Sequence, residues 1–414
     1  MEVLIMSNRE IDRLRVVRRV LEREYSWQEA GKQLGLCIRQ IGYICARVRR
    51  EGNKGVIHRL RGRPSNRKLS EVLREKVLKI VRGRYWDFGP TFANEKLLER
   101  HRIEISTETL RSWMVADGIW EKKRQRVRHR AWRERRSCVG ELVQVDGSLH
   151  KWFEERGGWC VLIAYIDDAT SQVMHAEFAE SEDTLTLMRT SRKYVEKYGR
   201  PVAFYVDKDS IFKTNREPNI EEQLKDERPS TQFTRAVGEL GIGVICADSP
   251  QAKGRIERLF KTFQDRLIKE MRLRGISTIE DANRFLHEEY LKIHNERFAK
   301  EPANHADAHR PLLATHKLDE VFSIRTGRTL LNDYTIRLKR QFYQLLEKQQ
   351  VILRPKAKIV AEERLDGSIH LRFKDKYLDY KLIPKNTEAK PKNRPFPLGG
   401  RNLSQEKETY AISI

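Results

Sequence analysis

The sequence predicts a multidomain protein with an all-α N-terminal part, a central α/β domain and a small C-terminal β-barrel. Three observations predict this class. Apolar residues recur with helical spacing through most of the first 120 residues, buried strands alternate with helices over residues 139–275, and strands of alternating polarity follow over residues 321–384. At 414 residues the chain is long enough to form several domains.

The composition points to a polyanionic partner. Charged residues make up 34% of the chain, and the formal net charge is +23. An excess of this size favours nucleic acid as the partner. The five cysteines are scattered and include no Cys-x-x-Cys pair, which argues against a disulfide framework or a zinc finger and fits a reducing compartment. No signal peptide or long apolar run is evident, so no membrane partner is expected.

Residues 1–58 are predicted to form a helix-turn-helix DNA-binding domain. A capping box at residues 26–29 (SWQE) opens a short second helix, and Gly35 ends it. In such a unit the last helix enters the major groove of DNA. Four side chains of this helix would then face the bases: Arg39, Gln40, Tyr43 and Arg47. An ordinary three-helix bundle with a polar face is the alternative.

Residues 59–68 (RLRGRPSNRK) form a basic linker broken by glycine and proline. Arg61 and Arg63 would bind DNA if the segment lies in a minor groove, and a plain flexible linker is an equal alternative. Residues 69–120 are predicted to form a second helix-turn-helix domain. Two modules in tandem would span a longer DNA site than one.

A second basic linker spans residues 121–138. Such a density of positive charge repels itself unless phosphates neutralise it, so the linker is predicted to bind the DNA backbone. Its positive residues are Lys122, Lys123, Arg124, Arg126, Arg128, Arg130, Arg133, Arg135 and Arg136.

The central domain (139–275) reads as strand, strand, strand, helix, strand, helix, strand, helix. Asp146 ends the first strand and Asp207 ends the fourth. Parallel neighbouring strands would place these two carboxylates side by side. Residues 212–230, rich in Glu, Lys and Pro, form a predicted insertion after the fourth strand.

The last helix of this domain begins at residues 248–250 (DSP), which suit a cap and a first helical turn. Lys253, Glu257 and Lys261 share one of its faces, beside an apolar stripe. They could form a solvated ion-pair ladder, which is the simpler interpretation for this helix alone. If Glu257 instead meets Asp146 and Asp207, three carboxylates repel one another and need a cation. Oxygen ligands of this kind select Mg²⁺ or Mn²⁺, and two ions can clamp an in-line phosphoryl transfer. Lys253 and Lys261 would then hold DNA phosphates.

These motifs resemble those of a known protein family. The chain is similar to DDE transposases of the retroviral-integrase superfamily, and in particular to the bacterial insertion-sequence group called ISNCY, over about residues 10 to 385. The segments that carry the resemblance are DGSLHKWF (146–153), IDDATS (166–171), SPQAKGRIERLF (249–260), HNERF (294–298), DAHRPL (307–312) and RLDGSIHLRFKDKYL (364–378).

The resemblance implies an RNase H-like core in which Asp146, Asp207 and Glu257 are the catalytic and metal-binding residues. Two departures stand out: the gap between the last two is longer than in retroviral integrases, and the zinc module of those integrases has no match. The implied partners are transposon terminal inverted repeats and target DNA, bound by a homo-oligomer in the bacterial cytoplasm, at the nucleoid. The implied reaction is metal-dependent strand cleavage and strand transfer. The alternatives are a nuclease of the same fold without strand transfer, and a catalytically silent DNA-binding regulator.

Other acidic residues compete for the site. Asp209 is the main rival for the second ligand, whereas Asp167 and Asp168 are predicted to shape a hairpin turn. Asp248 is interpreted as a helix cap. For four further residues, a role in packing or in a loop is favoured over a functional role: His150, Trp152, His305 and His309.

The rest of the chain is assigned more simply. Residues 276–320 are predicted to be a helical connector. Residues 321–384 are predicted to form the small β-barrel, with a hairpin turn at Asp366-Gly367. Residues 385–414 are predicted to be disordered.

Overall fold

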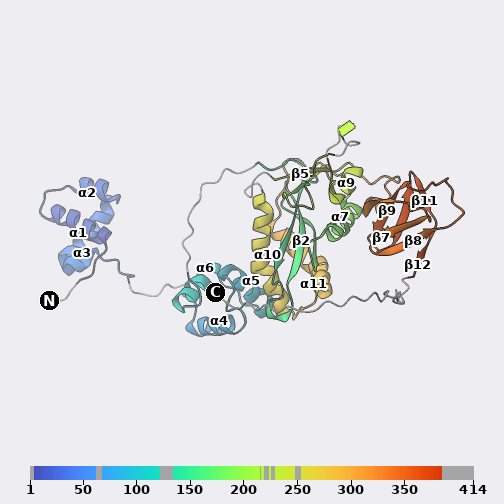
Figure 1. Ribbon diagram of the computed structural model, residues 1–414. Helices are drawn as coiled ribbons and strands as arrows, with labels where there is room; N and C mark the ends of the chain where they lie inside the picture. The colour runs from blue at the N-terminus through green and yellow to red at the C-terminus, as the bar shows by residue number, and fades with distance from the viewer. Residues whose placement is uncertain are drawn as a thin grey trace, which may run out of the picture. The chain divides into compact units, whose positions relative to one another are not determined.

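The computed structural model describes residues 4–61, 68–121, 134–214, 216–218, 223–224, 229–247 and 253–384. Its contacts divide the chain into two units, residues 1–126 and 127–414 (Figure 1). Within the described residues, no helix is both long enough and apolar enough to cross a membrane.

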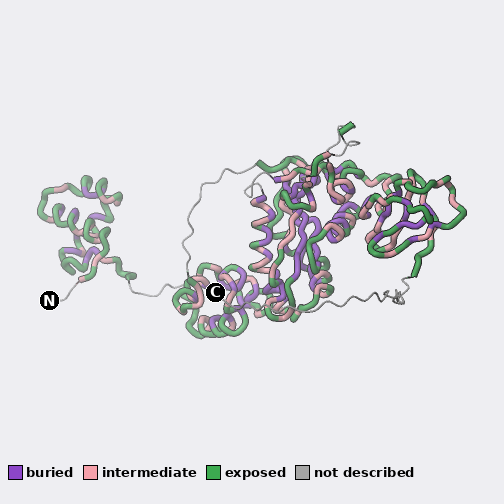
Figure 2. Tube along the Cα trace, in the orientation of Figure 1, coloured by how far each residue is buried: buried purple, intermediate pink, exposed green. Residues whose placement is uncertain are grey.

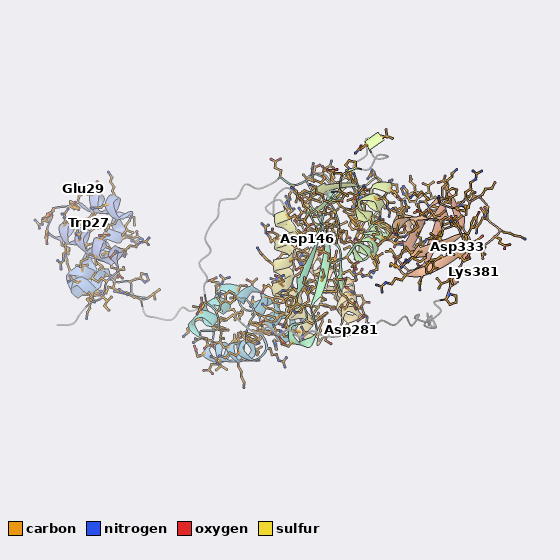
Figure 3. The ribbon with its side chains drawn as sticks, viewed as in Figure 1. Trp27, Glu29, Asp146, Asp281, Asp333 and Lys381 are labelled. Atoms are coloured by element: carbon orange, nitrogen blue, oxygen red, sulfur yellow. The ribbon has the colours of Figure 1, made fainter. Side chains whose placement is uncertain are left out.

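The first unit begins with the three predicted helices. They are α1 (Asn8–Leu21), α2 (Trp27–Leu34) and α3 (Ile38–Glu51), followed by the 3₁₀ turn η1 (Gly52–Val56). The capping box forms, because Glu29 accepts hydrogen bonds from Ser26, and Gly35 takes the left-handed conformation that ends α2 (Glu29 is labelled in Figure 3). The core of this module contains Val16, Val17, Val20, Ala30, Ile41, Cys45, Val48 and Val56.

Three more helices complete the first unit: α4 (Glu71–Arg84), α5 (Pro90–His101) and α6 (Thr107–Ala116). Pro90 opens α5, and Ser106 caps α6 by accepting a hydrogen bond from the backbone N–H of Thr109. Residues 69–120 are thus helical, and their assignment as a second helix-turn-helix domain stays a prediction.

The second unit is built on a five-stranded sheet with the order β3-β2-β1-β4-β5. The strands are β1 (Leu142–His150), β2 (Cys160–Asp167), β3 (Val173–Ala179), β4 (Ala203–Val206) and β5 (Gly243–Cys246), with the short turn η2 (Glu154–Arg156) after β1. The first three pair antiparallel, whereas β4 and β5 run parallel to β1. This is the strand arrangement that the RNase H-like prediction requires.

Helices cover both faces of this sheet. Buried residues concentrate in the sheet and on the helices that pack against it (Figure 2). One layer contains α7 (Thr184–Tyr198) and α9 (Gln232–Glu239). The other contains α10 (Gly254–Leu273), α11 (Ile279–Phe285), the π-helical turn η4 (Leu286–Tyr290) and α12 (Leu291–Phe298). Phe285, Leu286 and Tyr290 share a core with α10 and β2, so the predicted helical connector is largely part of the central domain.

The C-terminal module follows the short helix α13 (Leu318–Val321) and contains two open sheets, so the predicted closed barrel is wrong. One has the order β11-β10-β9-β6 and the other β12-β8-β7. The strands are β6 (Ser323–Thr329), β7 (Thr335–Leu338), β8 (Gln341–Leu345), β9 (Lys358–Arg364), β10 (Ile369–Phe373), β11 (Lys376–Leu378) and β12 (Tyr380–Ile383).

The two sheets stay open because no ladder of hydrogen bonds joins their edges, although their inner faces share one apolar core. Ile336 and Leu338 of one sheet meet Ile359 and Leu371 of the other in this core. The predicted turn at Asp366-Gly367 is confirmed: Gly367 has φ +81°, and β9 and β10 pair on either side of it.

Candidate catalytic and nucleic-acid-binding sites

The parallel pairing of β1 and β4 brings two of the predicted site residues together. Gln144 lies opposite Tyr205 in this register. Asp146 and Asp207 each follow two residues later, so both carboxylates emerge at the same edge of the sheet (Asp146 is labelled in Figure 3). Burial raises the pKa of Asp146, and the negative charge of Asp207 adds to this effect, whereas Lys253 opposes it.

Lys253 lies between the two aspartates. Its Nζ donates a hydrogen bond to Oδ1 of Asp146 at 3.0 Å and lies 3.8 Å from Oδ2 of Asp207. Lys253 is only 6% exposed, although it stands at the start of α10. The ammonium group therefore occupies the space between two carboxylates that would otherwise repel each other.

Glu257 is half-buried in the first turn of α10. It lies four residues after Lys253, and residues with this spacing share one face of a helix. The face of α10 that reaches the aspartates is thus the face that carries Glu257. Within the described part of the chain, no three acidic, histidine or cysteine side chains are close enough together to hold a metal ion, so Glu257 stands apart from the aspartate pair here.

Glu182, which precedes α7, is a further acidic group that the sequence analysis missed. Its carboxylate lies against the backbone of Gly147: a β-carbon at residue 147 would come within 2.0 Å of Oε2 of Glu182. Burial raises the pKa of Glu182 to about 7, and the charges of Asp146, Asp207 and Asp209 act in the same direction. The only sequence signal for this contact is a glycine directly after the first aspartate.

Asp168 anchors the start of α10 to the sheet. Its carboxylate is fully buried and accepts hydrogen bonds from Arg255 Nη1 at 2.6 Å, from Gln144 Nε2 at 2.8 Å and from the backbone N–H of Arg136 at 3.0 Å. The backbone N–H of Ile256 donates to Oε1 of Gln144 at 3.3 Å. These contacts tie β1, which carries Asp146, to the helix that carries Glu257 and to the end of the basic linker.

Asp167 has the turn role that the sequence predicts. It accepts hydrogen bonds from the backbone N–H and the hydroxyl group of Thr170, both at 2.8 Å. Asp168 does more than shape the turn, because it is buried and paired with Arg255. A buried carboxylate held by several donors is a structural element that short-range turn chemistry does not reveal.

The remaining competing residues have structural contacts. Asp209 is exposed and accepts a hydrogen bond from the backbone N–H of Ile211 at 2.9 Å. Trp152 is fully buried, and His309 accepts or donates a hydrogen bond with Tyr194 at 2.7 Å. Asp248 lies outside the described residues.

The side chains predicted to contact DNA differ in accessibility. Arg39, Gln40 and Tyr43 are exposed on α3, with the Arg39 guanidinium 5.6 Å from the Tyr43 ring centre. Arg47 points inward instead and donates a hydrogen bond to the carbonyl of Ile57 at 2.5 Å.

Outside α3, Arg61 forms an ion pair with Glu10 at 2.8 Å, and Lys261 is exposed on α10. Arg63 and the basic residues Lys122, Lys123, Arg124, Arg126, Arg128, Arg130 and Arg133 lie outside the described residues.

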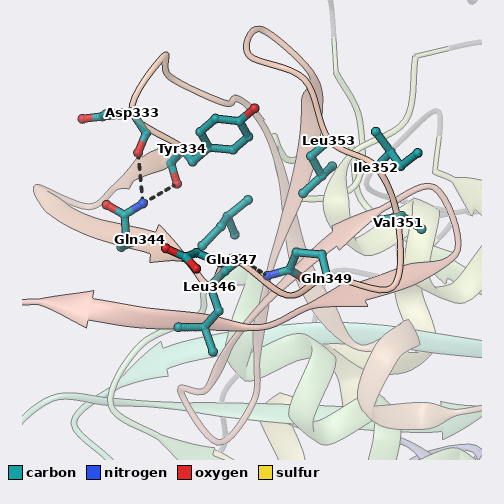
Figure 4. Close-up of a pocket in the computed structure, with 10 residues that line it drawn as sticks. Asp333, Tyr334, Gln344, Leu346, Glu347, Gln349, Val351, Ile352 and Leu353 are labelled. Atoms are coloured by element: carbon teal, nitrogen blue, oxygen red, sulfur yellow. Dashed lines mark hydrogen bonds between the residues drawn. The ribbon is translucent and has the colours of Figure 1, made fainter.

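A separate hollow of about 590 Å³ opens in the C-terminal module (Figure 4). Gln344 closes one side by donating hydrogen bonds to the carbonyls of Asp333 and Tyr334, at 3.0 and 3.3 Å. The lining has no basic side chain, so it does not favour phosphate. It consists of Asp333, Tyr334, Gln344, Leu345, Leu346, Glu347, Gln349, Val351, Ile352 and Leu353.

A helix-turn-helix domain model matches residues 12–65. A Sinorhizobium fredii protein named as the transposase y4bF is 39% identical over 387 residues, which are 93% of this chain and 83% of that protein. The transposase of insertion sequence IS1202 from Streptococcus pneumoniae is 26% identical, over 92% of this chain and 89% of that protein.

Among solved structures, a match is found with the HTLV-2 integrase catalytic core domain in complex with magnesium. The two sequences are 14% identical, the match covers 36% of this chain and 82% of that chain, and the TM-score is 0.26.

Proposed function

The chain belongs to the insertion-sequence transposase family and is a DNA transposase, and we propose that Asp146, Asp207 and Glu257 form its catalytic Asp/Asp/Glu set. The observation that carries this proposal is the meeting of Asp146, within β1, and Asp207, directly after the parallel neighbour β4, with one buried ammonium group between them. Carboxylates that meet on neighbouring strands in this way are well placed to act on a substrate at the same edge of the sheet.

The donor set fits a hard divalent cation. Asp146 and Asp207 supply carboxylate oxygens, and a positive group already occupies the space between them. Glu257 lies one helical turn beyond Lys253 on the same face of α10, so a modest adjustment of this turn would bring it to the pair. Mg²⁺ or Mn²⁺, as two ions when bound, would activate the attacking oxygen and stabilise the leaving oxygen of an in-line phosphoryl transfer.

The residues of the chain hold and orient the DNA in two successive reactions. In the first, a water molecule attacks a phosphodiester at the transposon end, and the 3′-hydroxyl group leaves. In the second, that 3′-hydroxyl attacks a phosphodiester of the target, so that one phosphodiester bond forms as another breaks. No covalent bond between protein and DNA is needed, and exposed Lys261 would hold a phosphate beside the site.

The N-terminal modules would select the DNA. Arg39, Gln40 and Tyr43 on the exposed side of α3 suit contacts to base edges in the major groove. We place terminal inverted repeats on these modules and target DNA at the catalytic core. Joining two ends to one target requires at least two copies of the chain, so a homo-oligomer on nucleoid DNA is part of the proposal.

A strand-transfer assay tests the proposal. Purified protein is given a labelled duplex of its terminal repeats and a plasmid target, with Mg²⁺ or EDTA. Asp207→Asn is the test variant, and Asp209→Asn is the matched control two residues away. Joined products that need Mg²⁺ and Asp207, and that survive the change at Asp209, support the transposase site.

The other outcomes separate the alternatives. Nicking without joining would favour a nuclease, whereas end binding without either reaction would favour a regulator. Cleavage by the Asp207→Asn protein would contradict the assignment of the second aspartate.

A further inference from the structure

The acidic edge of the sheet has more negative than positive charge. Asp146 lies within β1, Asp207 and Asp209 follow the end of β4, and the carboxylate of Glu182 lies against Gly147 on β1. The positive group found between Asp146 and Asp207 is the ammonium of Lys253, which also acts on Glu182. Among the described residues, two lysines, Lys253 and Lys208, accompany these four carboxylates, so the site has a residual demand for positive charge.

The burial of Lys253 is unusual for a lysine that would only contact DNA. A lysine at the start of a helix can extend into water at little cost, whereas this one is 6% exposed and directed at two carboxylates. Burial of a charged group costs free energy unless the group is paired. The pairing with Asp146 at 3.0 Å supplies that compensation.

We propose that Lys253 serves as the resident cation of the catalytic site: its ammonium occupies the place of a divalent ion until one binds and displaces it. This inference rests on the proposed function, because it takes Asp146 and Asp207 as the metal-binding pair. The displaced side chain is then free to contact a DNA phosphate at the same edge. Metal binding and the phosphate contact are therefore coupled through one side chain.

The coupling gives the metal-free protein a defined state. While Lys253 holds the two aspartates, their repulsion is reduced and the start of α10 stays attached to the sheet. A divalent ion carries twice the charge of an ammonium, so it compensates the acidic group more fully and releases the lysine. Glu182, whose carboxylate lies against Gly147 beside Asp146, would ionise more readily once a divalent ion is bound, which favours that ion.

The test compares Lys253→Met with Lys193→Met in the full-length protein. Lys193 is the matched control, since it pairs with the carboxylate of Glu177 at 2.7 Å in the same unit but away from the aspartate pair. Each protein is stripped of metal with EDTA, dialysed and titrated with MgCl₂ and MnCl₂ by calorimetry. Its melting temperature is recorded with and without the ion.

Removal of the competing ammonium should tighten metal binding by on the order of tenfold or more, because two charges a few ångströms apart interact strongly near a protein surface. The metal-free Lys253→Met protein should melt at a lower temperature than the wild type, and Mg²⁺ should restore more stability to it. Lys193→Met should leave the metal affinity unchanged. Equal or weaker metal binding by Lys253→Met would overturn the proposal while leaving the catalytic assignment intact.

A measurement on the wild type covers the case in which Lys253→Met does not fold. Acetylation of lysines by an amine-reactive reagent is followed by mass spectrometry, with and without Mg²⁺, using half-exposed Lys193 as the internal reference. Mg²⁺ should increase the labelling of Lys253 severalfold relative to Lys193. Unchanged labelling in a protein that binds Mg²⁺ would overturn the displacement of Lys253, whereas failure of the wild type to bind either ion would remove the metal from the proposed function as well.

Discussion

Two groups of carboxylates in the second unit have opposite electrostatic environments. Asp168 and Glu177 are buried among several donors: Asp168 meets Arg255 and Gln144, and Glu177 meets Lys193 and Arg189. The other group, Asp146, Asp207 and Glu182, has Lys253 as its shared positive partner.

The difference separates structural acids from candidate catalytic ones. At Glu177, burial alone would raise the pKa, but the surrounding positive and hydrogen-bonding groups lower it to about 2. At Glu182, burial and the neighbouring negative charges both raise the pKa, to about 7. Acids of the first kind are already satisfied by the fold. Acids of the second kind remain available to a cation that arrives from solution.

The largest expected effect is the loss of folding stability when Asp168 is replaced. Asp168→Asn would remove the buried carboxylate that lies 2.6 Å from the Arg255 guanidinium, whose side chain is 14% exposed. Breaking a buried ion pair by removing one member costs about 3–5 kcal/mol. Urea unfolding should show a loss of this size, and a loss below about 1 kcal/mol would mean that the pair is not structural.

Protonation of Glu177 should lower the folding stability of the protein in acid. Burial favours its neutral form, but the nearby His175 ring and the hydrogen bond from Lys193 outweigh burial and lower its pKa to about 2 from the ordinary 4.5. The stabilisation is therefore complete above pH 4.5 and is lost as the pH falls towards 2. The shift corresponds to on the order of 3 kcal/mol, because one pKa unit is about 1.36 kcal/mol.

The pH dependence of unfolding, measured with and without Glu177→Gln, checks this expectation. The wild type should lose more stability than the variant between pH 4.5 and 2. Parallel curves over this range would contradict the role of Glu177 as a satisfied structural acid.

Glu182 should give the opposite dependence in metal-free protein. Its pKa in the folded chain, about 7, lies above the ordinary 4.5, so its contribution is complete below pH 4.5 and is lost as the pH rises towards 7. Glu182→Gln should flatten that decline in EDTA. Mg²⁺ should also flatten it in the wild type, because a cation favours the ionised carboxylate. If neither Glu182→Gln nor Mg²⁺ changes this decline in stability, Glu182 does not interact electrostatically with the site.

The central fold was predictable because its signals are local. Runs of buried strand and helix residues predict the order of elements from β1 to α10. Parallel pairing of β1 and β4 brings Asp146 and Asp207 together, although β1 continues to His150 instead of ending at Asp146 as the sequence predicts. The hairpin at Gly367 was predictable for the same reason, since Asp-Gly favours that turn.

The parts that were missed depend on contacts between distant segments. Alternating polarity identifies the strands after residue 321 but does not determine whether their outer edges pair, which is why two open sheets replace the expected barrel. The approach of Glu182 to Gly147 depends on how α7 packs, and the inward turn of Arg47 depends on a carbonyl at Ile57. None of these contacts has a periodic signature in the sequence.

The most direct test of the central claim is the shift in melting temperature that Mg²⁺ produces in three proteins: the wild type, Asp146→Asn and Glu177→Gln. The account predicts that Mg²⁺ stabilises the wild type and Glu177→Gln to a similar degree, because Glu177 belongs to the satisfied group. Asp146→Asn should lose that stabilisation, because the neutral amide no longer supplies the carboxylate that would hold the ion. A full Mg²⁺ response in Asp146→Asn, or its loss in Glu177→Gln, would contradict the account.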